Sequence, residues 1–490
     1  MNVVGNVPRR ASSRPAASAL DQPVRLDRRF LLFSLLAALL LSWPLLAFGR
    51  PAYIQDSAAY YKGGRAAVSF ALAKIDQPEQ TATGAQSAES PLTNAAREAT
   101  GVRSITYSVA AYILSAPGAT MVLLALAQAL AAGAIIVAAL GAFGGLSARR
   151  TTATLVLLSG ASTVAVTSFL AVPDIFAGLL IASIILLAVA QSRLSTGIRL
   201  MCAAIAAFAM TAHPSHIPLA GGMTMLGLGW VAIGRYINEP PPRWTWAWVV
   251  APLLVGGLTI LALNRVAFGE ASLTSKQYPF LLARSINDGP GRWYLEKNCP
   301  ELRYTICTLY PDGVPKGGAL EFLWGKDGIA ERATPAQMDR VRAEEREIVL
   351  AAAKEYAGYE ARKLTFNIAR QLVTFRPYPF EHRIVLDDAG TPQLAPAPRS
   401  DQEILRIIGL LTAITAALGT AWLGWAFVRE RGLRPVIALV FLGILGNAAT
   451  CAILSAVSHR YQARVVWLIP LFALALYGSL AARKTKKSGN

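Results

Sequence analysis

Two short stretches, far apart in the chain, carry residue types suited to proton transfer and anion binding. The first, IQDSAAYYKGGR, places Asp56 ahead of Lys62 and Arg65, directly after the first long apolar stretch. The second, SHRYQARVVW, holds Arg460 and Arg464 ahead of the last apolar stretch. A carboxylate can take the proton of a hydroxyl group, and guanidinium groups offset negative charge. If the fold brings the two stretches together, they predict a general base beside an anion-binding site.

Further ionisable side chains stand near the ends of other apolar stretches. The candidates for a shared cavity are Asp174, His213, His216, His459, Tyr461 and His382. Ionisable groups near membrane depth are costly, so they tend to be functional. The first two histidines have no companion carboxylate in their own turn, and a zinc site needs more ligands than this pair supplies.

Each of these candidates also has a structural interpretation. Asp56 precedes Ser-Ala-Ala-Tyr and could cap a helix. Asp174 follows a proline and opens an apolar stretch, where a carboxylate favours the helix dipole. Arg460 and Arg464 could extend their charges to the membrane border. The sequence leaves both interpretations open.

The composition indicates a membrane protein with several spans. Hydrophobic residues make up 54% of the chain and charged residues 16%. The formal net charge of +18 comes without any zinc-finger, helicase or RNA-binding pattern, so we expect the lipid bilayer as a partner and not nucleic acid. Tyr60, Tyr61 and Trp467 are interpreted as aromatic residues of the membrane interface.

About ten apolar stretches are interpreted as spanning helices. They cover residues 30–49, 119–145, 152–171, 175–190, 198–212, 217–237, 246–268, 404–428, 435–457 and 466–482. The fourth and fifth are short for a full crossing. The sequence thus predicts an all-α polytopic membrane protein of about ten transmembrane helices.

The positions of the basic residues predict the orientation. They gather in the N-terminal tail, in alternate connections and in the C-terminal RKTKKSGN. Because cytoplasmic loops are rich in Lys and Arg, we expect both termini in the cytoplasm of a bacterium, with an uncleaved first anchor in its inner membrane. Arg460 and Arg464 then lie on the outer face, against this bias, which favours anion binding there.

This topology divides the chain into five regions. They are a disordered cytoplasmic tail (1–29), a membrane region of about seven helices (30–268) with an outward loop (50–118), a small α-rich extracytoplasmic domain (269–401), a membrane region of about three helices (402–482) and a basic cytoplasmic tail (483–490). Within the outward loop, the pattern predicts two surface helices over 56–74 and 92–116.

Two local patterns stand out in the extracytoplasmic domain. Cys299 and Cys307 are close together in a segment expected in an oxidising compartment, so we predict a disulfide. The stretch TPAQMDRVRAEEREIVLAAAKEY predicts a helix capped by Thr334, with Gln337 completing a capping box.

The arrangement resembles the GT-C class of membrane glycosyltransferases. The shared features are the first anchor, an acid early in the first outward loop, two surface helices in that loop and the late basic motif HRYQARVVWLIPL. The resemblance covers about Arg29 to Ala482. It implies an inverting transfer of a sugar from a polyprenyl-phosphate donor to an extracytoplasmic glycan, lipid or protein acceptor. It also implies that Asp56 is the base and that the donor phosphate is held by Arg460, Arg464, Lys62 and Arg65.

The sequence departs from that family at one point. The adjacent pair of acids common in the first loop is missing, and Asp56 stands there alone. In the family this acid can also help to bind a divalent cation. The requirement for Mg²⁺ or Mn²⁺, with Asp56 as a candidate ligand, therefore stays open.

Three other functions are compatible with the same stretches. An O-antigen ligase or polymerase would depend more on His382, Arg383 and Arg376 of the large loop. A transporter or flippase of lipid-linked glycans would call for repeated halves and ionisable groups at mid-membrane, and neither is evident. A purely structural membrane protein would need no cavity that joins Asp56 to Arg460.

Overall fold

The structure is a computed structural model of the chain. It describes residues 23–49, 51, 53–76, 103–115, 120–236, 242–274, 276–299, 301–377, 382–386 and 392–488. Most of the tail predicted over 1–29, and the first part of the surface helix predicted over 92–116, lie outside these residues.

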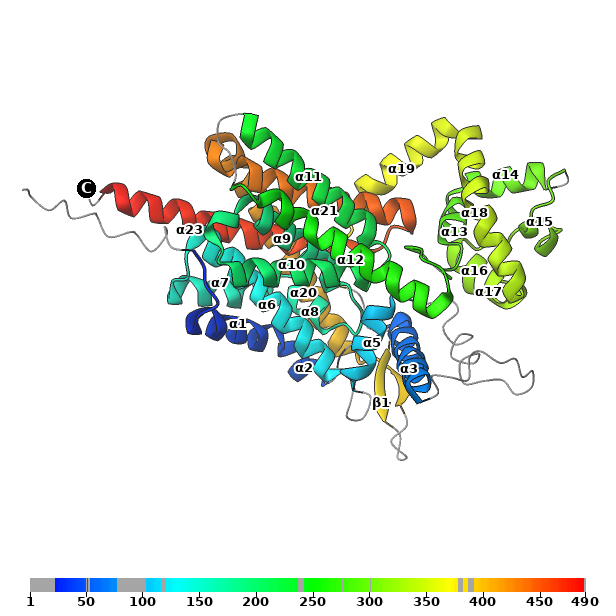
Figure 1. The fold of residues 1–490 in the computed structure, drawn as a ribbon, viewed down its shortest axis with the longest axis horizontal. Helices are drawn as coiled ribbons and strands as arrows, with labels where there is room; N and C mark the ends of the chain where they lie inside the picture. The colour runs from blue at the N-terminus through cyan, green and yellow to red at the C-terminus, as the bar shows by residue number, and fades with distance from the viewer. Residues whose placement is uncertain are drawn as a thin grey trace, which may run out of the picture.

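A bundle of long apolar helices forms the larger part of the molecule (Figure 1). Its helices are α1 (Arg28–Leu41), α2 (Trp43–Phe48), α6 (Val122–Gly144), α7 (Ala148–Ala161), α8 (Val164–Phe169), α9 (Ile175–Val189), α10 (Thr196–Ala212), α11 (His216–Tyr236), α12 (Thr245–Phe268), α20 (Arg399–Arg429), α21 (Arg434–Leu454), α22 (His459–Val466) and α23 (Leu468–Ser488). Short 3-10 turns at Gln191–Arg193 and Arg431–Leu433 join some of them.

The described residues include seven helices long and apolar enough to cross a membrane. They are Arg28–Phe48, Val122–Gly144, His216–Gly234, Thr245–Phe268, Arg399–Arg429, Arg431–Leu454 and His459–Ala481. Two further apolar helices, α9 and α10, are shorter. This supports a helical, multi-pass membrane protein, and the count of ten spans stays a prediction.

One predicted span is divided in the structure. The apolar stretch 152–171 forms α7 and α8, which are separated at Ser162 and Thr163. The Ser162 backbone is extended, and its hydroxyl donates to the carbonyl oxygen of Leu158 at 2.6 Å. A serine side chain that bonds the backbone offers an alternative to continuing the helix. The break therefore comes from local polar bonding that apolar content does not reveal.

The centre of the bundle is α9, whose side chains are buried on almost every side. It packs against α10, α11, α12, α21 and α22. A helix that is apolar all round belongs in an interior. At the rim, α12 and α20 expose rows of leucines, including Leu254, Leu258, Leu410 and Leu418. A bilayer would cover such a surface.

A second group of helices lies beyond one end of the bundle. There α3 (Gln55–Asp76) packs against α5 (Ile105–Ile113), the described parts of the two predicted surface helices. The others are α13 (Phe280–Asp288), α14 (Pro290–Asn298), α15 (Thr305–Leu309), α16 (Ala319–Trp324), α17 (Ile329–Arg332), α18 (Pro335–Glu355) and α19 (Ala357–Leu372). We call this end of the bundle the domain end.

Helices α13 to α18 surround an apolar core of their own, and we call them the disulfide domain. Leu282, Phe322, Val341 and Ile348 are among its buried side chains. The predicted disulfide between Cys299 and Cys307 is present, and so is the predicted capping box at the start of α18. An antiparallel hairpin of β1 (His382–Leu386) and β2 (Pro392–Pro396), which the sequence did not predict, leads from this region back to α20.

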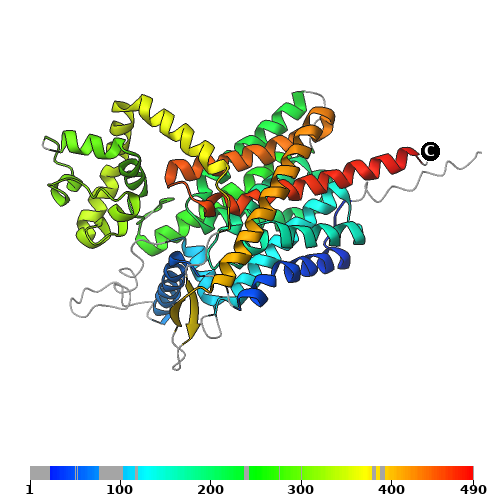
Figure 2. The ribbon, with the colours of Figure 1, turned by 180° about the vertical axis from the view of Figure 1, so that it is seen from behind.

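The two ends of the bundle differ in what lies beside them. Figures 1 and 2 show the disulfide domain, α3, α5 and the hairpin at one end, and the C-terminal part of α23 extending from the other. The start of α22, after the turn from α21, bonds α3 through Arg460 and Asp56, and the end of α10, before the turn to α11, bonds α5 through Thr211 and Thr106. The chain thereby brings several distant turns to one end of the bundle.

Candidate functional site

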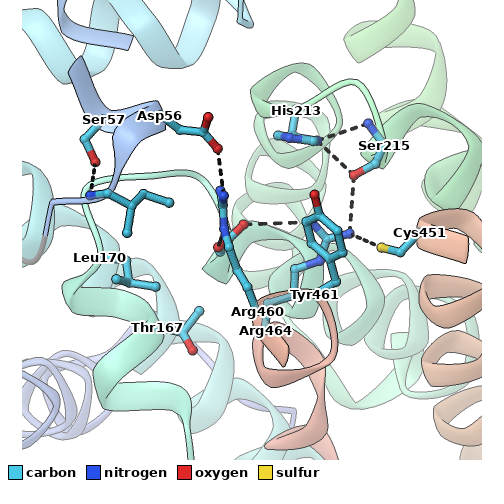
Figure 3. A network of polar contacts seen from close by, with 12 residues as sticks. Asp56, Ser57, Thr167, Leu170, His213, Ser215, Cys451, Arg460, Tyr461 and Arg464 are labelled. Atoms are coloured by element: carbon cyan, nitrogen blue, oxygen red, sulfur yellow. Dashed lines mark hydrogen bonds and ion pairs between the residues drawn. The ribbon is translucent and has the colours of Figure 1, made fainter. Parts of the chain in front are cut away.

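Three distant segments meet at Asp56, in the first turn of α3. Its Oδ2 accepts a hydrogen bond of 2.7 Å from Nη1 of Arg460, at the start of α22. Its Oδ1 accepts one from Nη2 of Arg103, just before α5. The same Arg460 donates through Nε to Oδ2 of Asp174, at the start of α9. One guanidinium group therefore joins the carboxylate of α3 to the carboxylate at the start of α9, and Figure 3 shows its bond to Asp56.

Arg464 lies one helical turn beyond Arg460 and is buried at 1% exposure. Its Nε donates to Oδ1 of Asn447 at 3.0 Å, and its Nη2 lies 3.1 Å from Sγ of Cys451. Its Nη1 has no hydrogen-bond partner and stands 3.9 Å from Oδ1 of Asp174, which has none either. A buried donor and a buried acceptor thus face each other across a gap that a small movement or a bound group would close.

The turn between α10 and α11 adds two histidines to this cluster. His213 bonds through Nδ1 to the hydroxyl of Ser215 at 2.8 Å, and Arg464 lies 3.3 Å from that same hydroxyl (Figure 3). Nδ1 of His216 lies 2.7 Å from the carbonyl oxygen of Ala209, so that nitrogen carries the hydrogen. The fully buried Nε2 of His216 is then an acceptor, and it has no partner.

The charges of the cluster do not balance. Three guanidinium groups, from Arg103, Arg460 and Arg464, face the two carboxylates of Asp56 and Asp174. Burial alone would raise the pKa of Asp56, but Arg460 and Arg103 outweigh it and hold that pKa below its ordinary value. By formal charge, these described side chains leave one positive charge in excess. Such an excess in a poorly hydrated place favours a bound anion.

A pair of buried tyrosines separates this cluster from the apolar interior. The rings of Tyr60 and Tyr107 meet edge to face at 4.9 Å. Tyr107 donates to Oε1 of Gln128 at 2.8 Å, and Gln128 donates in turn to the carbonyl oxygens of Ser168 and Leu170. Burial raises the pKa of both tyrosines, so their hydroxyl groups stay neutral.

An apolar cavity of about 380 Å³ opens on the other side of Tyr107. Its walls come from α5, α6, α9 and α10, and they include Leu114, Leu124, Phe176 and Phe208. Tyr107 lines this cavity and packs against Tyr60, which lies one helical turn after Asp56 on α3, so the tyrosine pair connects the cavity to the charged cluster. Pockets of this size are typical of sites for organic ligands.

A much smaller cavity of about 50 Å³, with both polar and apolar walls, adjoins Arg103. Its walls include Thr106, His213, Asn264 and Gln277. Arg103 both lines this cavity and bonds the carboxylate of Asp56. A hydroxyl-bearing ligand entering from that side would reach the cluster through Arg103.

No protein-family model, curated protein or solved structure matches this chain.

The structure brings most of the predicted site residues together. The cluster contains Asp56, Asp174, Arg460, Arg464, His213 and His216. Helix capping does not explain Asp174, because its side chain caps no amide of α9 and bonds Arg460 instead.

Other predicted residues lie at the margin of the cluster. Lys62 and Arg65 are further along α3 with exposed side chains. Nδ1 of His459 accepts from the backbone of Arg376, and Tyr461 bonds the hydroxyl of Ser455. His382 begins β1; its side chain lies outside the described part.

Several residues of the site were not predicted. Arg103 is one: it is a basic residue in an outward loop, and the argument from topology that selected Arg460 would also have selected it. Asn447 and Cys451, which hold Arg464, lie in an apolar stretch and give no such signal. The interface interpretation of Tyr60 and Trp467 is wrong, because both are 0% exposed.

The cluster does not fit a divalent cation held by the protein. Among the described residues, no group of three His, Cys, Asp or Glu side chains is placed to hold a metal ion. The two carboxylates that do converge, Asp56 and Asp174, are both bonded to Arg460. Hard cations prefer several oxygen ligands, and arginine repels them. We therefore assign no step to a metal.

Close packing between α3 and α5 positions Asp56 and Arg103, and it depends on Gly64. A Cβ at Gly64 would lie 2.0 Å from the carbonyl oxygen of Ser108, whereas one at Gly63 would lie 3.4 Å from its hydroxyl oxygen. We expect Gly64→Ala to destabilise the protein by about 1–3 kcal/mol, because it forces the helices apart.

The neighbouring glycine provides a matched control. Gly63→Ala introduces the same helix-favouring residue without the clash, so its midpoint of thermal unfolding should equal or exceed that of wild type. Thermal unfolding in detergent, followed by circular dichroism, measures both. Equal midpoints for the two variants would show that the close approach of α3 and α5 is not needed.

Proposed function

We propose that the chain is a membrane glycosyltransferase that moves a sugar from a polyprenyl-phosphate donor to a hydroxyl group of an acceptor. One observation supports this proposal above the others. A buried cluster with an excess positive charge adjoins an apolar cavity of about 380 Å³. A ligand that suits both has an anionic group attached to a long apolar chain.

In the proposed complex, the donor phosphate binds the arginines of the cluster. Arg460 and Arg464 can offer several N–H groups to phosphate oxygens, and paired N–H groups of arginine match that geometry well. The prenyl chain would pass Tyr107 into the apolar cavity. The phosphate competes with Asp56 for Arg460, which loosens the ion pair seen in the free protein.

Release of Asp56 from its ion pairs would make its carboxylate available as the general base of the transfer. While Arg460 and Arg103 hold its pKa low, Asp56 is a weak base. Once the phosphate takes part of their charge, that lowering is relieved and the carboxylate can take the acceptor proton. The acceptor oxygen then bonds to the anomeric carbon, and the bond from that carbon to the phosphate oxygen breaks. One displacement inverts the sugar carbon and leaves polyprenyl phosphate on the arginines.

The proposal includes the sidedness of the protein. The basic connections suggest that the end of the bundle opposite the disulfide domain faces the cytoplasm. The cluster then lies at the outer face of a bacterial inner membrane, and the acceptor reaches it from outside. The disulfide supports an oxidising compartment on that side.

A comparison of a charged prenyl lipid with its uncharged counterpart tests this function directly. The purified protein in lipid nanodiscs is titrated with a short-chain polyprenyl phosphate and, as a control, with the matching uncharged polyprenol. We expect the phosphate to bind at least about tenfold more tightly, because a charge-assisted bond contributes about 1.5–3 kcal/mol. Equal affinities would refute a phosphate site. Transfer itself is tested in a second assay with a radiolabelled polyprenyl-phosphate sugar.

A further inference from the structure

Three polar side chains of helix α19 point inward and bond other parts of the molecule. Glu360 accepts a bond of 2.5 Å from Arg284 in the disulfide domain. Asn367 donates to Oδ2 of Asp288 at 3.0 Å. Gln371 bonds the backbone of Ser458, just before α22, through both its amide oxygen and its amide nitrogen. The inner face of α19 is thus held by polar contacts along its length.

The outward face of α19 is apolar and basic. Phe366 is 59% exposed, and Val373, directly after the helix, is 73% exposed. Ala369 lies between them, and Arg362 and Arg370 flank them with exposed side chains. None of the exposed side chains of α19 is acidic. A helix facing bulk water normally has the opposite arrangement, with charges of both signs outward.

The position of α19 suggests what covers this face. Its C-terminal end packs on α21, and α21 itself exposes Leu442, Leu445 and Ile453. Those side chains belong to a helix apolar and long enough to cross a membrane. Figures 1 and 2 show α19 running from the domain end of the bundle toward α18. Helix α19 thus adjoins a helix whose exposed apolar side chains a bilayer would cover.

We propose that the outward face of α19 lies in the headgroup layer of the bilayer and binds anionic phospholipid. Phe366 and Val373 would enter the border of the acyl chains, and Arg362 and Arg370 would contact lipid phosphates. An amphipathic helix with basic and bulky apolar residues on one face binds membranes in this way. Because Gln371 ties α19 to Ser458, the contact also sets the height of the disulfide domain above the charged cluster.

Spin labels on the full-length protein in nanodiscs test this contact. Ala369→Cys and Val373→Cys place labels on the outward face, and Ala336→Cys places one on the exposed first turn of α18 as a control. The native thiols of Cys202 and Cys451 are buried and the other two cysteines form the disulfide. Unmutated protein carried through the labelling gives the background.

For each label we compare the rate of collision with oxygen to the rate of collision with a water-soluble nickel chelate. We expect this ratio to be several-fold higher at the two α19 labels than at the control label. The difference should be larger in discs of phosphatidylglycerol than in discs of phosphatidylcholine, and Arg362→Glu with Arg370→Glu should remove this lipid dependence. The proposal would be overturned if the α19 labels were as accessible to the nickel chelate as the control label is. So would spin–spin broadening between molecules, which would show that a second copy covers the face. Neither readout depends on glycosyl transfer.

Discussion

Arg460→Ala is expected to destabilise the folded protein by about 3–5 kcal/mol, as the removal of one partner from a buried ion pair does. The substitution leaves Asp174, which is buried, without its bonded partner, and leaves Asp56 with Arg103 alone. The fall in the midpoint of thermal unfolding in detergent measures the effect. Arg431→Ala, at an exposed arginine, is the matched control and should change the midpoint little.

The pH dependence separates this explanation from a simple loss of packing. In the wild type, the lowered pKa of Asp56 means that its ion pairs stabilise the protein above the unfolded value of about 3.9 and lose that effect as the pH falls through the folded pKa. In Arg460→Ala, one arginine fewer opposes the burial of Asp56, so keeping the Asp56 carboxylate charged becomes costly at neutral pH. The difference between variant and wild type should therefore shrink as the pH falls toward about 4. A difference independent of pH would contradict the electrostatic origin.

The sequence predicted which turns meet at the domain end, but not how their side chains pair. The charge rule for loops places Arg460 on the same side as Asp56 without any knowledge of packing. The two residues are 404 positions apart, and the bond between them depends on how α3 and α22 are set around α9. That arrangement results from side-chain packing in the bundle, which a single sequence does not reveal.

Trp467 shows why the aromatic residues were misplaced. A tryptophan near the end of an apolar stretch suits the membrane interface, where its ring is apolar and its N–H is wet. Here the ring packs where Gly178 leaves room, and a Cβ on that glycine would lie 2.6 Å from it. Its Nε1 donates to the carbonyl oxygen of Arg464 at 2.9 Å. Burial became possible because one glycine on α9 removes the steric obstacle, and Trp467 thereby supports the turn that carries Arg464.

Asp56→Asn should lower the rate of the proposed sugar transfer by about 10²–10⁴-fold, the range that a general base contributes. The amide has the size of the carboxylate, but its single oxygen replaces only one of the two oxygens that accept from Arg103 and Arg460, and it cannot take the acceptor proton. Asp339→Asn is the control, because that carboxylate is 51% exposed in the disulfide domain. Transfer at the wild-type rate by Asp56→Asn would show that another group is the base.

The binding of polyprenyl phosphate to Asp56→Asn distinguishes a base from a structural residue. Removal of this negative charge leaves Arg103, Arg460 and Arg464 opposed by Asp174 alone, so the anionic lipid should bind at least as tightly as to wild type. A variant whose site had collapsed would lose binding and transfer together. Slow transfer with undiminished binding is therefore the expected pair of results, and it would mean that Asp56 acts in the transfer step and is not needed to hold the donor.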